Sequence, residues 1–273
     1  MSEKKKIYEH NYTLPLILAV LALVFLLFLY FQTKPKPQTD DETTTTPETT
    51  QDEPMNEEKT PAVSFQSDLS AFEEAMTASD EAYLLLVNKQ HPLGASYAPE
   101  QTVKVKDTHK DIELEKTAAL ALEAMFIEMR ACGIRDVFVT SAYRTYAYQE
   151  WLFHYYIEDE MAKDPSLSRE QAKKLVLVYS AAPGTSEHQS GLSVDLMTNT
   201  MRELDESFAT YPVYDWLTEN AWKFGFVLRF PKDKTDITGY QYEPWHYRFV
   251  GRDAAYQMWK DGLCLEEFLE QKQ

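Results

Sequence analysis

Two short stretches of the sequence carry side chains that could hold a metal ion. His188 and Asp195 lie seven residues apart in PGTSEHQSGLSVD (183–195), and Glu243 and His246 lie three apart in EPWH. Two imidazoles and one carboxylate form the ligand set of a catalytic Zn²⁺ site that keeps its fourth position for water. The remaining carboxylate is then free to act as a base on that water. We therefore predict His188, Asp195 and His246 as zinc ligands and Glu243 as the general base.

The residues around Asp195 favour a strand that carries this carboxylate on one face. Residues 192–197, LSVDLM, alternate with a period of two, so Ser193, Asp195 and Met197 share a face. A carboxylate among apolar strand neighbours is costly to bury without a cation, and Zn²⁺ would supply one. Taken alone, each short pattern also fits an exposed aspartate on an edge strand and a histidine in a polar loop.

A second group of candidate residues follows another predicted strand. Residues 135–144, RDVFVTSAYR, would deliver Ser141 and Arg144 to the end of that strand, where a scaffold fixes functional side chains well. A guanidinium can bind a free carboxylate through two parallel hydrogen bonds, or stabilise a developing oxyanion. We predict Ser141 and Arg144 as substrate-binding residues, with a catalytic part for Arg144. A structural salt bridge is the alternative for Arg144.

Three motifs together are similar to the signatures of the VanY-type D-alanyl-D-alanine carboxypeptidases. They are SxHxxGxxxD at 186–195, SAYRT at 141–145 and EPWH at 243–246. The similarity runs from about Leu86 to Arg252, with serine at position 193 where the family usually has alanine. This family belongs to a zinc peptidase group that also includes the VanX dipeptidases and the hedgehog fold.

The resemblance carries expectations about the substrate and its contacts. It implies hydrolysis of the D-Ala-D-Ala end of a peptidoglycan stem peptide by metal-activated water. It also implies substrate contacts from Gln149 and Ser186. Three alternatives remain open at this point: an L,D-carboxypeptidase that acts on tetrapeptide stems, a peptidoglycan endopeptidase, and a zinc-binding module without catalytic activity. Glu243 speaks against the last, because a purely structural zinc site needs no such base.

The first part of the chain predicts a membrane anchor and a tether. Residues 14–31 form an uncharged run that would span about 27 Å as a helix, close to the thickness of a bilayer core. Lysines at 4–6 precede it, and no small-x-small cleavage site follows, so we expect an uncleaved single-pass anchor with residues 1–13 inside. Residues 32–66, rich in Thr, Pro, Glu and Asp, predict a disordered linker.

Residues 67–273 are predicted to form one zinc carboxypeptidase domain, which the resemblance places outside the cell membrane. We expect an α+β fold in which a small, mainly antiparallel sheet carries the zinc site and helices flank it. Its strands are predicted near 83–88, 135–144, 192–197, 226–230 and 240–247, and its helices near 68–77, 113–131, 146–162, 168–180, 211–224, 253–260 and 264–271. Ser168 and Gln171 resemble a capping box that opens the helix near 168–180.

Composition excludes some functions and leaves others open. The 273 residues are 44% hydrophobic, which is ample for a packed core, and the formal net charge of −17 argues against nucleic acid as a partner. Cys132 and Cys264 are the only cysteines, too few for a disulfide framework. They could form one disulfide in an oxidising compartment or remain as two thiols.

Overall fold

The computed structural model describes residues 60–272, and the predicted anchor and most of the predicted linker lie outside them. Among these residues, no helix is long and apolar enough to cross a membrane. Residues 60–66, which the sequence assigned to the linker, contact the domain. Thr60 donates a hydrogen bond to Asp253, and the ring of Phe65 lies 5.1 Å from that of Phe224. This packing places the end of the predicted linker with the domain.

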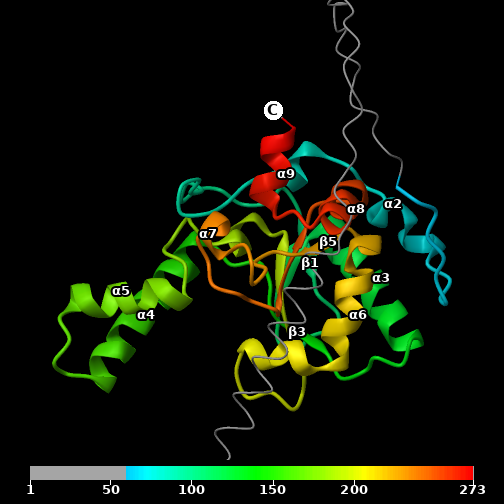
Figure 1. Ribbon diagram of the computed structural model, residues 1–273. Helices are drawn as coiled ribbons and strands as arrows, with labels where there is room; N and C mark the ends of the chain where they lie inside the picture. Colours follow the sequence, from blue (N-terminus) through cyan, green and yellow to red (C-terminus); the bar gives the residue numbers. More distant parts are fainter. Residues whose placement is uncertain (1–59, 273) are drawn as a thin grey trace, which may run out of the picture. The chain divides into compact units, whose positions relative to one another are not determined.

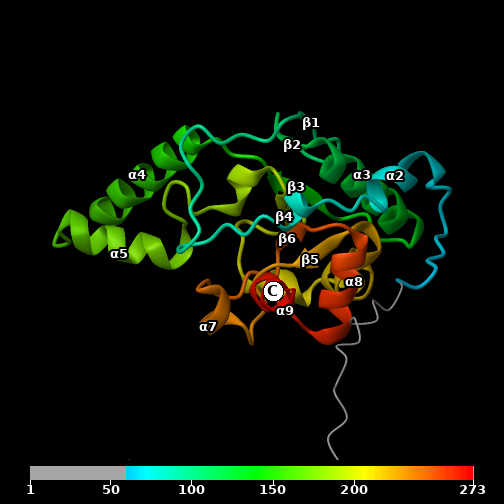
Figure 2. The ribbon, with the colours of Figure 1, turned by 90° about the horizontal axis from the view of Figure 1, so that it is seen from above.

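A four-stranded antiparallel sheet forms the centre of the domain, in the order β3-β4-β6-β5 (Figures 1 and 2). A second, two-stranded antiparallel sheet joins β1 to β2. The α+β architecture with small antiparallel sheets and flanking helices is confirmed. The strands are β1 (Thr102–Lys104), β2 (Glu113–Glu115), β3 (Phe138–Ser141), β4 (Ser193–Met197), β5 (Phe226–Leu228) and β6 (His246–Phe249).

Helices surround the sheet, and several begin or end where the sequence predicts. The α-helices are α2 (Glu73–Met76), α3 (Lys116–Ala131), α4 (Tyr146–Lys163), α5 (Arg169–Tyr179), α6 (Pro212–Asn220), α7 (Thr235–Thr238), α8 (Arg252–Asp261) and α9 (Leu265–Gln271). The 3₁₀ turns are η1 (Ser70–Phe72), η2 (Glu81–Leu84), η3 (Glu187–Ser190), η4 (Glu206–Thr210) and η5 (Ala221–Phe224). Ser168 and Gln171 form the predicted capping box of α5.

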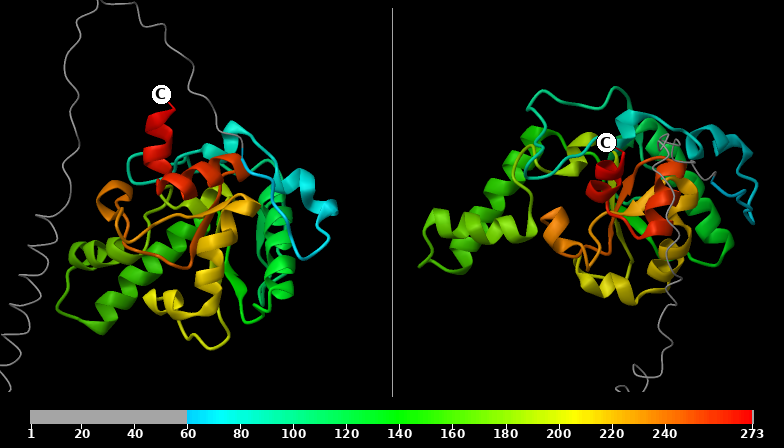
Figure 3. Two further views of the ribbon diagram at one scale, coloured as in Figure 1. Left: turned by 45° about the vertical axis from the view of Figure 1, so that its right-hand side comes forward. Right: turned by 45° about the horizontal axis from the view of Figure 1, so that its top comes forward.

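The two faces of the four-stranded sheet have different chemistry. Val194, Leu196, Tyr247 and Phe249 share one face and are buried in the main core with residues of α3 and α6. Those two helices run beside the sheet in Figure 3. The opposite face carries polar residues of the same strands, namely Ser193, Asp195, His246 and Arg248. A period of two therefore separates the core from the site, as expected for a strand.

Helices α4 and α5 form a hairpin that extends away from the sheet (Figure 2). Its facing sides make a small core of their own, with Phe153 and Ile157 from α4 against Ala172 and Val176 from α5. The hairpin thus buries one face of α4 against α5 and leaves Tyr148, Trp151 and Tyr155 exposed on α4.

Three sequence predictions differ from the structure in their details. Residues 83–88 were expected as a buried strand but contain a 3₁₀ turn followed by irregular chain. There the carbonyls of Tyr83 and Leu85 accept hydrogen bonds from the Arg248 guanidinium in place of a neighbouring strand. The first three residues of the predicted helix 113–131 pair with β1 instead. The predicted strand 240–247 begins only at His246.

Candidate active site

The sheet and one tight turn bring the predicted metal ligands together. Asp195 on β4 lies directly opposite His246 on β6, so both side chains project from the same face. His188 comes from η3, which ends at Gly191 in a left-handed conformation with φ of 73°. A glycine adopts this conformation without strain, and the chain can turn from η3 directly into β4.

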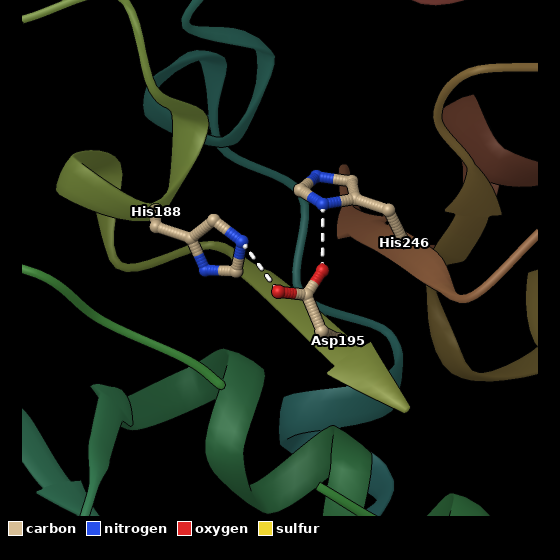
Figure 4. A group of neighbouring side chains, drawn as sticks. All are labelled: His188, Asp195 and His246. Carbon is tan, nitrogen blue, oxygen red and sulfur yellow. Dashed lines mark hydrogen bonds and ion pairs between the residues drawn. The ribbon is translucent and has the colours of Figure 1, made fainter. Parts of the chain in front are cut away.

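The three side chains converge on a single point (Figure 4). His188 Nε2 lies 3.1 Å from Asp195 Oδ2, and His246 Nδ1 lies 3.0 Å from Asp195 Oδ1. One ligand atom from each residue falls within 4.8 Å of the others, and all three residues are buried. The sequence prediction of this trio as a set of neighbours is therefore matched by the geometry.

The donor atoms fit a divalent metal such as zinc. His188 Nδ1 lies 2.7 Å from the carbonyl oxygen of Ala142, which can only accept, so Nδ1 carries the proton and Nε2 keeps a free lone pair. Burial, together with the positive charge of Arg144, lowers the pKa of His188 to about 4. This imidazole is therefore neutral at pH 7, which is the form that binds metal.

Glu243 lies beside the trio without belonging to it. Its Oε2 is 3.8 Å from His246 Nδ1, and its side chain is only 14% exposed. Burial raises the pKa of Glu243 to about 7, although the charges of His246 and Arg144 oppose this rise. A carboxyl group with a pKa near neutrality can both take up and return a proton at physiological pH.

These residues line a cleft of about 430 Å³. Arg144 and Ser186 both border it, together with Tyr240, whose hydroxyl donates to the carbonyl oxygen of Thr185. The Nε of Arg144 is buried and has no hydrogen-bond partner within residues 60–272. A guanidinium at the wall of a cleft is well placed to receive an anionic group.

The other two predicted substrate residues do not line this cleft, although Ser141 on β3 pairs with Asp195 on β4. Gln149 is buried behind the wall of the cleft, where its Nε2 donates to the carbonyl oxygen of Ala181 at 2.7 Å. Ser141 borders an adjoining hollow of about 650 Å³ that shares Arg144 with the cleft. The structure thus brings Arg144 and Ser186 to the cleft, and it places Gln149 and Ser141 at its margins.

Glu187 is a buried carboxylate beside the metal trio that was not predicted from the sequence. Glu187 accepts hydrogen bonds from Arg229 at 2.6 Å and from Arg248 at 2.9 Å, and Arg229 also binds Glu266 through both of its terminal nitrogens. Burial raises the pKa of Glu187, but the two arginines outweigh this effect and hold the pKa well below its ordinary value. Glu187 is therefore ionised.

Glu187 also faces the second nitrogen of a metal ligand. Its Oε2 lies 3.6 Å from His246 Nε2, a nitrogen that has no hydrogen-bond partner in the described part of the chain. With Nδ1 of His246 turned toward Asp195, a carboxylate beyond Nε2 favours the tautomer with its proton on Nε2. The sequence did contain a signal for this buried carboxylate. Arg229 and Arg248 lie in the aromatic stretches FVLRF and HYRF, and a charge in such a stretch needs a buried partner.

The chain matches known zinc peptidases over most of this domain. Residues 111–252 match the family VanY, described as D-alanyl-D-alanine carboxypeptidase. A D-alanyl-D-alanine carboxypeptidase of Enterococcus faecalis is 39% identical over 186 residues, which are 68% of this chain and 65% of the relative. The matched region therefore spans slightly less than two thirds of that relative.

Solved structures agree with this assignment. A glutamate-to-alanine mutant of VanY from a VanB-type vancomycin resistance cassette, in complex with Zn(II), is 37% identical, with a TM-score of 0.58 over 69% of this chain and 99% of that one. The LdcB LD-carboxypeptidase is 35% identical, with a TM-score of 0.59 over 68% of this chain and 84% of that one. The candidate metal trio, the fold and the sequence all point the same way, and this chain belongs to the VanY family of D-alanyl-D-alanine carboxypeptidases, which are zinc enzymes.

Proposed function

We propose that this chain removes the terminal D-Ala from peptidoglycan stem peptides that end in D-Ala-D-Ala. The observation that carries the proposal is the buried trio His188, Asp195 and His246, with Glu243 at 3.8 Å from His246 in the wall of an open cleft. A VanY-type relative, VanYB, has been solved in complex with D-alanine-D-alanine and is 37% identical to this chain. That ligand supports the same dipeptide end as the substrate here.

In the proposed mechanism, Glu243 acts first as a general base and then as a general acid. A bound Zn²⁺ would act as a Lewis acid that lowers the pKa of a water molecule to about 7 and polarises the scissile carbonyl. Glu243 takes the proton from that water and returns it to the nitrogen of the leaving D-Ala. Its pKa of about 7 suits both steps, since neither protonation state is strongly disfavoured at neutral pH.

Arg144 and the serines are assigned to substrate binding. Arg144 donates to the terminal carboxylate or to the developing oxyanion, and its place in the wall of the cleft supports this role. Ser186, in the wall of the cleft next to Glu187, and Ser141, in the adjoining hollow, supply hydroxyl contacts. Gln149 acts by fixing Ala181, which borders the cleft.

The proposed location is the outer side of the cell membrane. The apolar run 14–31 supports a single-pass anchor with the N-terminus inside, and a stem peptide outside the membrane would suit a tethered enzyme. Protease treatment of intact and of permeabilised cells that express the full chain tests this topology. Digestion of the domain in intact cells is expected, and protection there would contradict the proposal.

The activity is tested with the full chain in detergent, loaded with Zn²⁺ or treated with a chelator. Mass spectrometry would follow two stem peptides, a pentapeptide that ends in D-Ala-D-Ala and a tetrapeptide that ends in a single D-Ala. We expect loss of one D-Ala from the pentapeptide alone, and no loss after chelation. Cleavage of the tetrapeptide alone would replace the proposal with L,D-carboxypeptidase activity.

A further inference from the structure

Three aromatic side chains form a row on the outward face of α4. Tyr148, Trp151 and Tyr155 are spaced three and four residues apart, which places them on one side of the helix. Their ring centroids are 5.6 and 5.7 Å apart, and their exposed fractions are 50%, 57% and 53%. We call these three residues the aromatic row.

The aromatic row is not needed to hold the hairpin together. The core of the hairpin lies on the other side of α4, where Phe153 and Ile157 meet α5. A row of half-exposed tyrosine and tryptophan rings is unfavourable in water, and such surfaces are typical of binding sites. We therefore expect the aromatic row to bind a partner outside the described residues.

The aromatic row is continuous with the active-site cleft. Tyr148 borders the hollow that also contains Ser141 and Arg144, and Tyr156, the neighbour of Tyr155, borders both this hollow and the cleft. Tyr156 also lies 5.8 Å from Tyr155, measured between ring centroids. A ligand that leaves the cleft past Arg144 thus meets the aromatic row first.

The distance from the start of α4 to the far end of the row is close to the length of a stem peptide. Thr145, next to Arg144, is the N-cap of α4, and Tyr155 lies ten residues further on, or about 15 Å along the helix. An extended peptide of five residues spans about 17 Å. If the carboxyl end of a stem is held at Arg144, as the proposed function states, the amino end reaches the region of Trp151 and Tyr155. In peptidoglycan, that amino end is joined to the glycan strand.

The chemistry of the row favours a sugar over a membrane surface. The faces of pyranose rings are lined with C–H groups, which stack on aromatic rings, and tyrosine hydroxyls can bond the sugar hydroxyls at the edge. Helix α4 carries four carboxylates against a single lysine. Anionic lipid would be repelled by such a surface, because interfacial helices are rich in lysine and arginine.

We propose that Tyr148, Trp151 and Tyr155 form a carbohydrate-binding platform that holds the glycan strand of the substrate while its stem peptide lies in the cleft. This inference rests on the proposed function for the direction of the stem. The enzyme would then bind both the glycan strand and the stem peptide of its substrate.

The test compares two substrates in the full-length, zinc-loaded protein. The first is the free pentapeptide, and the second is the same peptide attached to polymeric glycan. The variants are Trp151→Ala and Tyr155→Ala, with Val178→Ala as the matched control, because Val178 is an exposed apolar residue on α5 that lies outside the row. The variants are expected to cleave the free peptide as the wild type does, and to lose about tenfold in kcat/KM on the glycan-linked peptide.

A binding assay gives an independent readout. Glycan strands stripped of their peptides are expected to retain the wild type and the Val178→Ala variant, but not the Trp151→Ala variant. Equal cleavage of both substrates by all variants would overturn the platform, and so would a wild type that glycan strands do not retain. A wild type that cleaves neither substrate would instead refute the proposed function, so the two failures are distinguishable.

Discussion

The proton held by His246 should control how zinc binding depends on pH. Burial lowers the pKa of His246, but hydrogen bonds and charge from Asp195 and Glu187 outweigh burial and raise the pKa to about 9. The pKa of His188 is about 4, so at pH 7 the metal-free protein carries one proton on His246 and none on His188. Zinc needs the lone pair of each imidazole, and its binding must therefore displace one proton.

The size of the effect on the zinc Kd follows from the difference between the pKa of His246 and the pH of the measurement. At pH 7 the pKa of about 9 lies two units above the pH, so removing the proton costs about 3 kcal/mol, or about a hundredfold in the zinc Kd. The Kd should fall about tenfold for each unit of pH between 6 and 8 and level off near pH 9. The sign is fixed, because a group protonated in the metal-free state opposes the metal more strongly as the pH falls.

Titration of the metal-free protein with Zn²⁺ against a competing chelator measures this slope. The measurement is best made in the Glu243→Gln variant, since the pKa of Glu243 is about 7 and its own titration would otherwise add to the slope. Proton release into a weak buffer gives a second readout, with about one proton per zinc expected from His246 at pH 7, in addition to the share released by water on the metal. A Kd that stays constant from pH 6 to 8, with no proton released, would refute this account of His246.

Other substitutions test the remaining parts of the site. Glu243→Gln should keep its zinc and lose about a thousandfold in kcat, measured by metal analysis and D-Ala release, and retained turnover would remove Glu243 as the base. Arg144→Lys should lower kcat/KM about tenfold to a hundredfold by losing the paired hydrogen bonds, and a variant with unchanged kcat/KM would contradict that role. Gly191→Ala should lower the free energy of unfolding by about 2 to 4 kcal/mol, seen as a lower Tm. Its φ is 73° and an added Cβ would lie 2.7 Å from Pro99 Cγ, so an unchanged Tm would show that the turn relaxes freely.

The sequence predicted the trio of His188, Asp195 and His246 from two short motifs and from their similarity to the VanY-type signatures. The alternation around Asp195 placed its side chain on one face, and the structure confirms a strand over Ser193–Met197. The capping box at Ser168 likewise predicted the start of α5 from neighbouring residues. Such features depend on a few adjacent side chains and on backbone geometry, which can be read without knowing the fold.

The surroundings of the site depended on contacts that no local pattern contains. The carboxylate of Glu187 meets Arg229 and Arg248, which are 42 and 61 residues away along the chain. The stretch 83–88 has the composition of a strand, yet its carbonyls are satisfied by Arg248 and not by a neighbouring strand. Choosing between these outcomes requires the position of a distant side chain, and for this reason the sequence alone could not predict them.

The buried charge network behind His246 also has a consequence for folding. It links Asn88, Glu187, Arg229, Arg248 and Glu266, residues drawn from both ends and the middle of the domain. Removing one partner of a buried ion pair costs about 3 to 5 kcal/mol, so a partly folded chain that lacked any of these segments would be heavily penalised. The imidazole of His246 is therefore oriented only after all segments that contribute to the network have come together. Zinc occupancy would then report completed folding, with little metal captured by partly folded forms.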